Sequence, residues 1–438
     1  MTPAREEMRA RSIGRIASRG AVALAMAWTV AGMPWASAGG GHPGTLDRSF
    51  GHAGRLTKAF GSADAFGMAV AHQGAEIVVA GTHEFQTTAD IAVSRMLAGG
   101  RPDRTFGGDG RVTVDLAGTY DEANAVAALP HGKILVAGTR TTPTTDTFLA
   151  LRLTSNGRLD HTFGGGDGFV TTGFGTGSAT GYAMTVLADG RFEICGATTS
   201  GTNSSAALAR YRPDGKLDRT FGGDGRVVAD FPGQTQSACI GVTHDRNETV
   251  MSGWAYDGAS TNSIALARFG PAGMPDASFD ADGYVLISTG TYQSSGQSVV
   301  ALPSGGVVAA GYEYNPGSGN LDVMLLRLTA QGQPDAGFGG GDGIVVVDFG
   351  GDDTANGLVR QADGKFIVAG SRDDDMIVVR FLKGGARDAT FGKDGLQAKP
   401  WGGRSDGRAA VLMKGKVVVA GSLEKAHYRM AVERVFAG

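Results

Sequence analysis

The stretch Leu217-Asp218-Arg219-Thr220-Phe221-Gly222 contains a four-residue motif that occurs seven times along the 438-residue chain. The motif is an Asp, any residue, usually a Ser or Thr, and then a Phe. Successive copies lie 56, 57, 58, 58, 59 and 53 residues apart. Self-similarity at a fixed period of this size is typical of propellers, solenoids and related arrays. The motif Asp residues are Asp47, Asp103, Asp160, Asp218, Asp276, Asp335 and Asp388.

Each unit also contains four short runs with the composition of β-strands. A β-rich run follows the Phe, as at 111–116, and a run of small apolar residues such as 123–129 comes next. A third run ends in Val-Ala-Gly or a close variant, and a fourth ends near an Arg. Four short strands joined by tight turns predict one antiparallel sheet in each unit, which is the pattern of a propeller blade.

We therefore expect an all-β fold, a seven-bladed β-propeller of four-stranded antiparallel blades over residues 46–438. The chain enters the repeat with a spare strand at 55–60 and ends, around 428–436, one strand short of a complete unit. The N-terminal strand is expected to complete the last blade and close the ring. A straight solenoid is the alternative, but it would need distinct end caps, and none is visible in the sequence.

The Arg that ends the fourth run has a fixed spacing to the motif. Six of these Arg residues stand eight positions before the next motif Asp. Arg434 has no motif Asp after it and Asp47 has no such Arg before it, so ring closure would bring these two together. We expect each Arg and Asp to pair across the connection between a blade's third and fourth strands, in a structural role. The Arg residues are Arg95, Arg152, Arg210, Arg268, Arg327, Arg380 and Arg434.

Composition narrows the class of protein. Glycine is abundant, 72 residues, and is spread along the chain, which suits many tight turns. With 42% hydrophobic residues the chain can bury a core, so disorder is excluded. The formal net charge is −3, and no basic tract interleaves with aromatic residues. Nucleic acid is therefore not an expected partner.

Residues 1–38 have the layout of a secretory signal peptide. Five Arg residues precede a mostly apolar stretch at 20–35, and Ala36-Ser37-Ala38 provides a small-x-small cleavage pattern. The apolar stretch is short for a membrane span, although a single membrane anchor is the alternative. We expect an exported protein, periplasmic, cell-surface or secreted, with a short linker at 39–45. After cleavage it would have no stable membrane span and would be a monomer.

The two cysteines, Cys195 and Cys239, fall on neighbouring units. Export makes a disulfide between them chemically possible. The alternative is that each is a small buried hydrophobic residue.

The chain resembles the delta-60 repeat, a bacterial family named for a unit of roughly sixty residues. The resemblance rests on the phrase at 217–222, on Ala362-Asp363-Gly364-Lys365-Phe366-Ile367-Val368-Ala369-Gly370, and on the strand ending at Arg380-Phe381. It covers about residues 46–438, and the last unit departs from it most. The resemblance implies an exported, propeller-like protein of poorly defined activity and supplies no catalytic residues.

A Gly-Asp-Gly phrase follows the Phe in several units. Asp-rich turns can hold calcium, but one carboxylate per turn also suits a tight turn in which Asp accepts a backbone hydrogen bond. We favour the turn, and the scattered His residues show no metal-binding spacing. No cofactor or metal is expected, with calcium as the alternative. These acids are Asp109, Asp167, Asp224, Asp282, Asp342 and Asp394.

The loops that vary between units are the places to look for function. The loop after the Val-Ala-Gly strand and the loop before the small-apolar strand should share one end of the ring. Exposed aromatic residues there suit a protein, peptide or glycan ligand, although several could simply pack on neighbouring loops. The candidate binding residues are Phe85, Tyr120, Trp254, Tyr256, Tyr292, Tyr312, Tyr314 and Trp401.

The expected function is binding through this loop face. One alternative is a polysaccharide-acting lyase or glycoside hydrolase with carboxylates at the central pore. Another is a purely structural envelope module. The small-apolar runs that would face the axis contain mostly Ala, Val, Gly and Met, which favours the two non-enzymatic readings.

Overall fold

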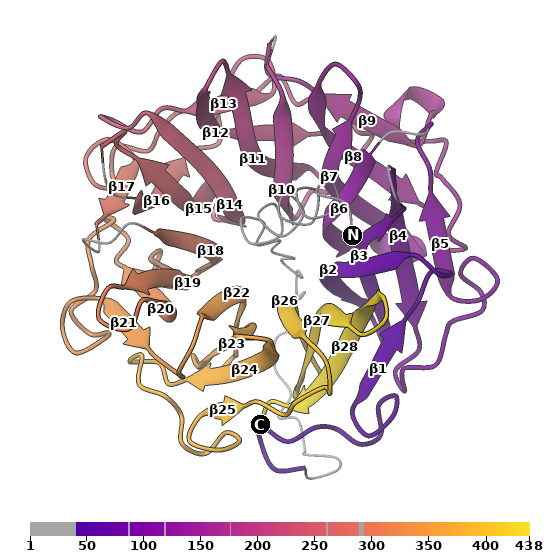
Figure 1. Ribbon diagram of the computed structural model, residues 1–438. Helices are drawn as coiled ribbons and strands as arrows, with labels where there is room; N and C mark the ends of the chain where they lie inside the picture. Colours follow the sequence, from indigo (N-terminus) through magenta and orange to yellow (C-terminus); the bar gives the residue numbers. More distant parts are fainter. Residues whose placement is uncertain (1–40, 86–87, 118–119, 176, 260–261, 289–292) are drawn as a thin grey trace, which may run out of the picture.

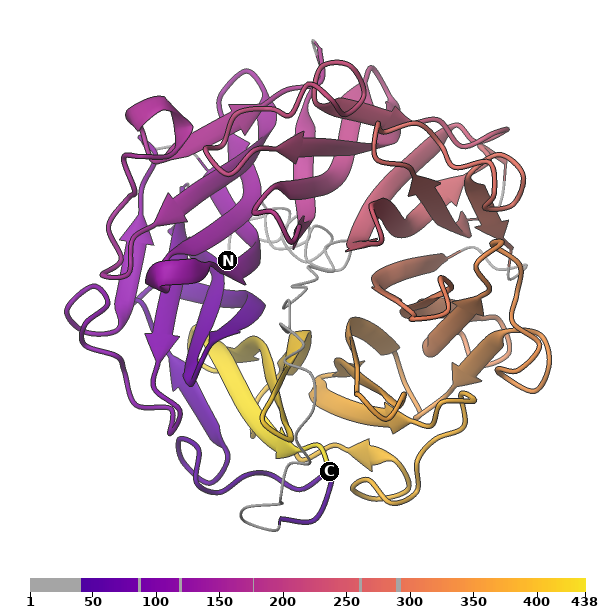
Figure 2. The same cartoon turned by 180° about the vertical axis from the view of Figure 1, so that it is seen from behind.

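The computed structural model describes residues 41–85, 88–117, 120–175, 177–259, 262–288 and 293–438. These residues form an all-β fold of antiparallel sheets arranged around a central axis (Figures 1 and 2). Two 3-10 turns, η1 (Pro130–Gly132) and η2 (Gly164–Gly166), interrupt the loops. Within these described ranges, no helix has the length and apolar character needed to cross a membrane. The signal-peptide prediction for residues 1–38 lies outside the described residues.

The strands occupy four successive positions from the axis outward. The innermost strands are β2 (Asp64–Gln73), β6 (Tyr120–Ala128), β10 (Ala179–Val186), β14 (Gln236–Asp245), β18 (Ser294–Ala301), β22 (Asp353–Arg360) and β26 (Ser405–Met413). The second strands are β3 (Glu76–Glu84), β7 (Ile134–Thr141), β11 (Phe192–Ser200), β15 (Glu248–Tyr256), β19 (Val307–Asn315), β23 (Phe366–Arg372) and β27 (Lys416–Glu424).

The outer half of each sheet repeats in the same way. The third strands are β4 (Ala89–Met96), β8 (Asp146–Leu153), β12 (Asn203–Tyr211), β16 (Asn262–Phe269), β20 (Asn320–Leu328), β24 (Asp375–Phe381) and β28 (Tyr428–Phe436). The outermost strands are β1 (Arg55–Lys58), β5 (Arg111–Val114), β9 (Phe169–Thr172), β13 (Arg226–Ala229), β17 (Tyr284–Ile287), β21 (Ile344–Val347) and β25 (Leu396–Gln397).

Five sheets have four strands each, and an eight-stranded sheet holds β2 to β9. The eight-stranded sheet divides into β2–β5 and β6–β9, which are joined by one parallel bridge between Ala89 and Tyr120. All other strand pairs are antiparallel. They join strands that are consecutive in the chain, except for β1, which pairs with β28. The prediction of four-stranded antiparallel sheets is therefore confirmed.

The core lies between neighbouring sheets and is made of small and β-branched side chains. The seven motif Phe residues are at most 1% exposed, so each anchors its unit in this core. Alternate residues of the inner strands point to the two neighbouring sheets, and both faces are buried. This is why these strands read as small apolar runs rather than as alternating apolar and polar residues.

The Gly that ends each Val-Ala-Gly run has a steric cause. The strand opposite it carries an irregularity in register at this point, as between Gly67 and Ala69 opposite Gly81. A Cβ at Gly81 would come within 1.8 Å of the Phe66 carbonyl oxygen. The equivalent Gly138 would meet the Glu122 oxygen at 1.9 Å. Any side chain there would push the inner strand away, so glycine recurs.

The two ends of the chain share one sheet. β1 pairs with β28 from Arg55 opposite Glu433 to Lys58 opposite Met430. The preceding segment continues the contact, because the Gly44 amide donates to the Phe436 carbonyl at 2.8 Å. Asp47 accepts from Arg434 Nε at 2.8 Å, although 387 residues separate them. Asp47 and Arg434, which each lack a partner at the eight-residue spacing, therefore form an ion pair with each other.

The Arg–Asp prediction is confirmed for six of the seven pairs. In these the Arg nitrogen and the Asp oxygen lie 2.7–2.9 Å apart. The Asp also accepts from the amide two residues on, and from the Ser or Thr hydroxyl where there is one, as Asp103 does from Thr105. The Arg reaches this hydroxyl too, with Arg95 Nη2 2.9 Å from Thr105 Oγ1. These bonds explain why the motif prefers Ser or Thr.

The prediction is wrong for Arg210 and Asp218, which exchange partners. Arg210 pairs with Glu193 at 2.6 Å, and Asp218 pairs with Arg191 at 2.9 Å. Glu193 stands opposite Arg210 in the β11–β12 pair, where Leu135 stands opposite Arg152 in the previous unit. The buried Glu193 competes with Asp218 for the Arg210 guanidinium, so Arg210 pairs with Glu193 instead of the motif Asp.

The same Arg residues also bridge neighbouring sheets. Arg152 Nη1 donates to the Pro213 carbonyl at 2.6 Å, and Arg268 Nη1 donates to the Ala330 carbonyl at 2.8 Å. Arg434 contacts the Ala98 carbonyl in this way, across the junction of the chain ends. Each such Arg therefore ties the end of its own sheet to the loop of the next one.

Asp47→Ala should lower the free energy of unfolding by about 3–5 kcal/mol, because it leaves the buried Arg434 without its counter-charge. Although burial acts to raise it, the pKa of Asp47 is held well below its usual range by Lys416, Ser49 and Arg434. Urea unfolding measures the loss. The matched control is Asp109→Ala, which removes an exposed carboxylate paired with Arg111 and should cost about 0–1 kcal/mol. Equal losses in the two variants would contradict the pairing of the chain ends.

Candidate functional site

The candidate site is a cavity of about 560 Å³ where the inner strands β22 and β26 begin. The loops predicted to share one end of the ring meet here, because residues after the second strands and before the inner strands line it together. We call it the loop-face cavity. It is lined by Phe66, Tyr312, Leu321, Asp352, Thr354, Asn356, Ser371, Asp373, Asp374, Arg404, Ser405, Asp406, Arg408, Ser422 and Tyr428.

Two carboxylate–guanidinium pairs dominate the polar lining. Asp406 Oδ2 accepts from Arg408 Nη2 at 2.6 Å, and its Oδ1 accepts from the Ser422 amide at 2.7 Å. Arg404 Nε lies 2.8 Å from Asp374 Oδ1, and both of these side chains are more than half exposed. The first pair is held within the sheet, whereas the second can meet a ligand.

A second polar group forms the opposite wall. Asp373 Oδ1 accepts from the Asp352 amide at 3.0 Å, and Asp352 Oδ1 accepts from the Leu321 amide at 3.0 Å. Asn356 Nδ2 donates to the Gly407 carbonyl at 2.8 Å, which links β22 to β26. These bonds fix the positions of the acids, so their remaining oxygens present acceptors at defined places.

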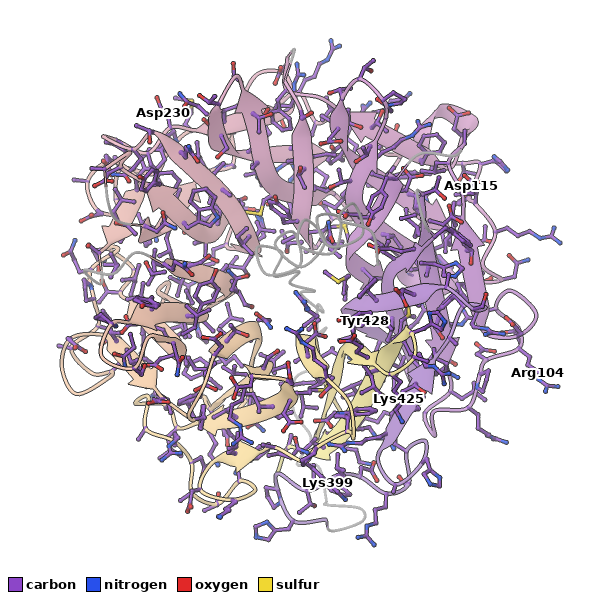
Figure 3. The ribbon with its side chains drawn as sticks, viewed as in Figure 1. Arg104, Asp115, Asp230, Lys399, Lys425 and Tyr428 are labelled. Atoms are coloured by element: carbon purple, nitrogen blue, oxygen red, sulfur yellow. A yellow bond between two sulfur atoms is a disulfide. The ribbon has the colours of Figure 1, made fainter. Side chains whose placement is uncertain are left out.

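Aromatic rings complete the cavity. The rings of Phe66 and Tyr428 are tilted against each other with centroids 4.6 Å apart, where β2 meets the last sheet; Figure 3 labels Tyr428. The Tyr428 amide donates to Asp64 at 2.8 Å, and its hydroxyl donates to Glu424 at 2.8 Å. Burial raises the pKa of Tyr312, whose ring faces the cavity from β19. Polar groups and flat apolar rings therefore face the same space.

The predicted aromatic residues do not gather into one surface. Of those that the structure describes, Tyr312 is the one that lines the loop-face cavity. Trp401 lies under the Arg55 guanidinium at 4.5 Å, and Trp254 packs on Ala197 and Ile240. Phe85 is 48% exposed.

The other candidates lie in loops or at strand ends. Tyr120 donates its hydroxyl to Glu84, and Tyr256 and Tyr314 are half-buried. Tyr292 lies outside the described residues. Whether any of these residues binds a ligand stays a prediction.

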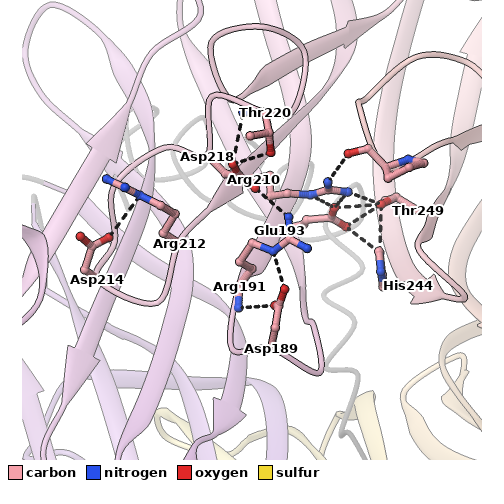
Figure 4. Close-up of polar contacts among 11 residues, drawn as sticks. Asp189, Arg191, Glu193, Arg210, Arg212, Asp214, Asp218, Thr220, His244 and Thr249 are labelled. Carbon is pink, nitrogen blue, oxygen red and sulfur yellow. Dashed lines mark hydrogen bonds and ion pairs between the residues drawn. The ribbon is translucent and has the colours of Figure 1, made fainter.

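A second cavity, of about 440 Å³, lies where the inner strands end, and His72 and His244 both line it. Next to it is the buried cluster around Glu193 (Figure 4). Thr249 donates its hydroxyl to Glu193 at 2.8 Å, and His244 Nδ1 lies 3.8 Å from the same carboxylate. Burial raises the pKa of Glu193, and the Arg210 charge opposes that rise. Burial and the Arg210 charge lower the pKa of His244 to about 4.

Three further sequence features have a defined place. Cys195 on β11 and Cys239 on β14 form a disulfide with a Cα–Cα distance of 5.7 Å, which links neighbouring sheets. The Gly-Asp-Gly acids serve as turn acceptors: Asp109 Oδ1 accepts from the Arg111 amide at 3.0 Å, and Asp342 Oδ1 accepts from the Ile344 amide at 3.0 Å. Ser405, in a Gly-x-Ser-x-Gly stretch, is buried and accepts from the Met376 amide.

Several lining residues were not anticipated from the sequence. Asp406 and Arg408 begin an inner strand, where most other units have uncharged residues. Asp374 and Arg404 come from turns in two different sheets. The one available signal was the departure of the last unit from the shared pattern.

Comparisons with known proteins support the fold. Residues 129–163, 187–221 and 361–391 match a family described as "Domain of unknown function (DUF5122) beta-propeller". A polysaccharide lyase, Uly1, has a similar solved structure with a TM-score of 0.50 at 10% identity, covering 85% of this chain and 90% of that chain.

Two further solved structures are similar at lower scores. One is Sqt1 from Chaetomium thermophilum bound to the N-terminus of the ribosomal protein L10, with TM-score 0.46, 9% identity and coverage of 85% and 97%. The other is the β-propeller domain of the Trilobed protease from Pyrococcus furiosus, with TM-score 0.46, 8% identity and coverage of 87% and 97%. A search of curated proteins found no match.

Arg210→Met should lower the free energy of unfolding by about 3–5 kcal/mol, because Glu193 would remain buried without its counter-charge. Since burial raises the pKa of Glu193 and removing Arg210 raises it further, protonation relieves part of this cost at low pH, and the loss should be larger at pH 8 than at pH 5. The double variant Glu193→Leu/Arg210→Met removes both charges and should recover most of the stability. A double variant less stable than Arg210→Met would contradict the exchange of partners. Urea unfolding at pH 5 and pH 8 measures both effects.

Proposed function

We propose that this protein is an exported β-propeller that binds a protein, peptide or glycan ligand in the loop-face cavity. The observation that carries the proposal is the cavity's lining, in which the exposed Arg404–Asp374 pair and the fixed acids lie beside the rings of Tyr312 and Tyr428. Cavities that bind small or extended ligands combine apolar surface with a few placed polar groups.

Binding is favoured over catalysis by the engagement of two of the cavity acids, Asp406 and Asp374. A glycoside hydrolase typically needs a pair of carboxyl groups free to exchange protons with the substrate, and a lyase needs a free general base. Both oxygens of Asp406 are occupied by Arg408 and the Ser422 amide, and Asp374 faces Arg404. Groups engaged in this way orient a ligand more readily than they transfer protons.

We also propose that the propeller has seven blades and is closed by its N-terminal strand. The seven-fold recurrence of the motif supports the count, and the β1–β28 pairing together with the Asp47–Arg434 contact supports the closure. On this proposal the units are delta-60 repeats. Closure leaves no unpaired edge at the chain ends, which favours a monomer.

Export is proposed on the basic and apolar start of the chain and on the Cys195–Cys239 disulfide. Disulfides persist in oxidising compartments such as the periplasm or the extracellular space. Residues 1–38 would be removed, leaving a mature chain without the apolar stretch.

Glycan and peptide arrays probed with the mature chain should identify ligands for the loop-face cavity. For any ligand found, Arg404→Ala should weaken binding at least tenfold, because the guanidinium is an exposed donor in the cavity wall. Isothermal titration calorimetry measures the change in Kd.

The matched control is Arg212→Ala, which removes an exposed Arg 3.8 Å from Asp214 on a different sheet. It should leave the Kd unchanged. Binding that survives Arg404→Ala, or that is lost equally in Arg212→Ala, would place the ligand elsewhere and contradict the proposal.

A further inference from the structure

Three acidic side chains converge at the step from β21 to β22. Asp322 comes from the start of β20, Asp348 follows β21, and Asp353 opens β22. One carboxylate oxygen from each lies within 4.8 Å of the other two. The three residues belong to two neighbouring sheets, so the fold rather than local sequence brings them together.

Two of the three carboxylates are buried with an oxygen left over. Asp322 is 2% exposed and Asp353 is 0% exposed. Asp322 Oδ2 accepts from Asn315 Nδ2 at 2.9 Å, and Asp353 Oδ2 accepts from the Phe349 amide at 2.6 Å. The Oδ1 atoms of both residues are buried and have no hydrogen-bond partner in the described structure.

No cation among the described residues contacts these acids: Arg372 stands opposite Asp353 in the β22–β23 pair, but it pairs with Asp375 and acts on Asp353 only from beyond ion-pair distance. Among the described residues, no Lys, Arg or His nitrogen lies within 4.0 Å of a carboxylate oxygen of Asp322, Asp348 or Asp353. Glu313, which stands opposite Asp322 in the β19–β20 pair, adds further negative charge nearby. A buried carboxylate without a counter-charge is costly, so it must take up a proton or a cation.

The pKa values of these acids reflect their burial and the repulsion between neighbouring carboxylates. Burial raises the pKa of Asp353 to about 7, and the charges of Asp348 and Asp322 add to the rise, while the Phe349 amide and the Arg372 charge oppose it. Burial and the Asp322 charge also raise the pKa of Glu313. Three carboxylates facing one point therefore favour a bound positive charge.

We propose that Asp322, Asp348 and Asp353 form a calcium site between the sheets that contain β20 and β22. Calcium binds carboxylate oxygens at about 2.3–2.6 Å, so ligand atoms on opposite sides of the ion can be about 4.8 Å apart. Three protein carboxylates leave the remaining positions to carbonyl groups or water, which corresponds to a Kd of about 10⁻⁵–10⁻³ M. This site differs from the Gly-Asp-Gly turns, whose acids accept backbone amides.

The site lies next to the loop-face cavity, so a bound ion would stabilise one wall of that cavity. Asp353 follows Asp352, and Asp322 follows Leu321, and both of these neighbours line the loop-face cavity. The ion would join β20 to the β21–β22 connection and so hold that wall of the cavity. The assignment itself does not depend on the proposed ligand binding.

The test is thermal unfolding of the full mature chain, first treated with EDTA and then titrated with CaCl₂ or MgCl₂. Calcium at 100 times its Kd should raise Tm by about 2–4 °C, with a smaller effect of magnesium. Calorimetric titration should give one calcium ion per chain. No rise in Tm up to 10 mM calcium (on the order of the weakest calcium sites), or a larger rise with magnesium, would overturn the assignment.

Two variants separate metal binding from a purely structural role. Asp353→Asn removes a buried charge, so in EDTA its Tm should equal or exceed that of the wild type, while the calcium-dependent rise should disappear. Asp348→Asn changes an exposed residue, cannot disturb the core, and should weaken calcium binding at least tenfold.

Asp342→Asn is the matched control, because it removes an exposed turn carboxylate at the other end of β21, outside the site. It should keep the full calcium effect. A calcium response that persists in both Asp348→Asn and Asp353→Asn would reject the site.

Discussion

The structure depends on an Arg guanidinium group that recurs at the same place in each unit. Except at Arg210, the Arg at the end of a third strand binds the motif Asp, and in several units it also lies over the motif Phe ring and donates to a carbonyl in the next sheet. In the second unit these contacts are Arg152 with Asp160 at 2.7 Å, with the Phe163 ring centroid at 4.8 Å, and with the Pro213 carbonyl at 2.6 Å. A planar fork with five donors suits several partners at once, which a Lys could not satisfy. Intra-sheet geometry and sheet-to-sheet contact are thereby fixed by a single side chain.

The two faces of the ring of sheets differ in what their residues do. The Arg residues lie where the third strands end, whereas the loop-face cavity and the three acids lie where the third and inner strands begin. The first face repeats the same chemistry from unit to unit. The second face carries residues that vary between units, such as Arg404 and Asp374. A rigid, repetitive scaffold presenting variable loops is the usual way in which such folds acquire sites.

Much of the scaffold could be predicted because its chemistry is local and repeated. The period, the four strands in each unit and the eight-residue Arg–Asp spacing are all sequence patterns. The exception at Arg210 also left a signal, since Glu193 stands where equivalent positions hold Val78, Leu135 or Val250. Glu193 competes with Asp218 for Arg210 at this buried position, and the Arg–Asp spacing alone could not predict this exchange.

The candidate site was much less predictable, because its parts come from different sheets. Asp322, Asp348 and Asp353 are spread over three strand ends, and no spacing rule links them. The aromatic residues were expected to be exposed because they stand in loops, yet neighbouring side chains cover some of them. Trp401 is capped by Arg55 from the first described strand, a contact that spans almost the whole chain.

Native-state hydrogen exchange tests the central claim that the Arg contacts couple all sheets, including the one shared by the chain ends. If they do, amides in β1 and β28 should open with the same free energy as amides in the interior strands β12 and β16, because the sheets unfold together. If β1 and β28 exchange through openings of clearly lower free energy, the chain ends are not held as the other sheets are, and the account is wrong.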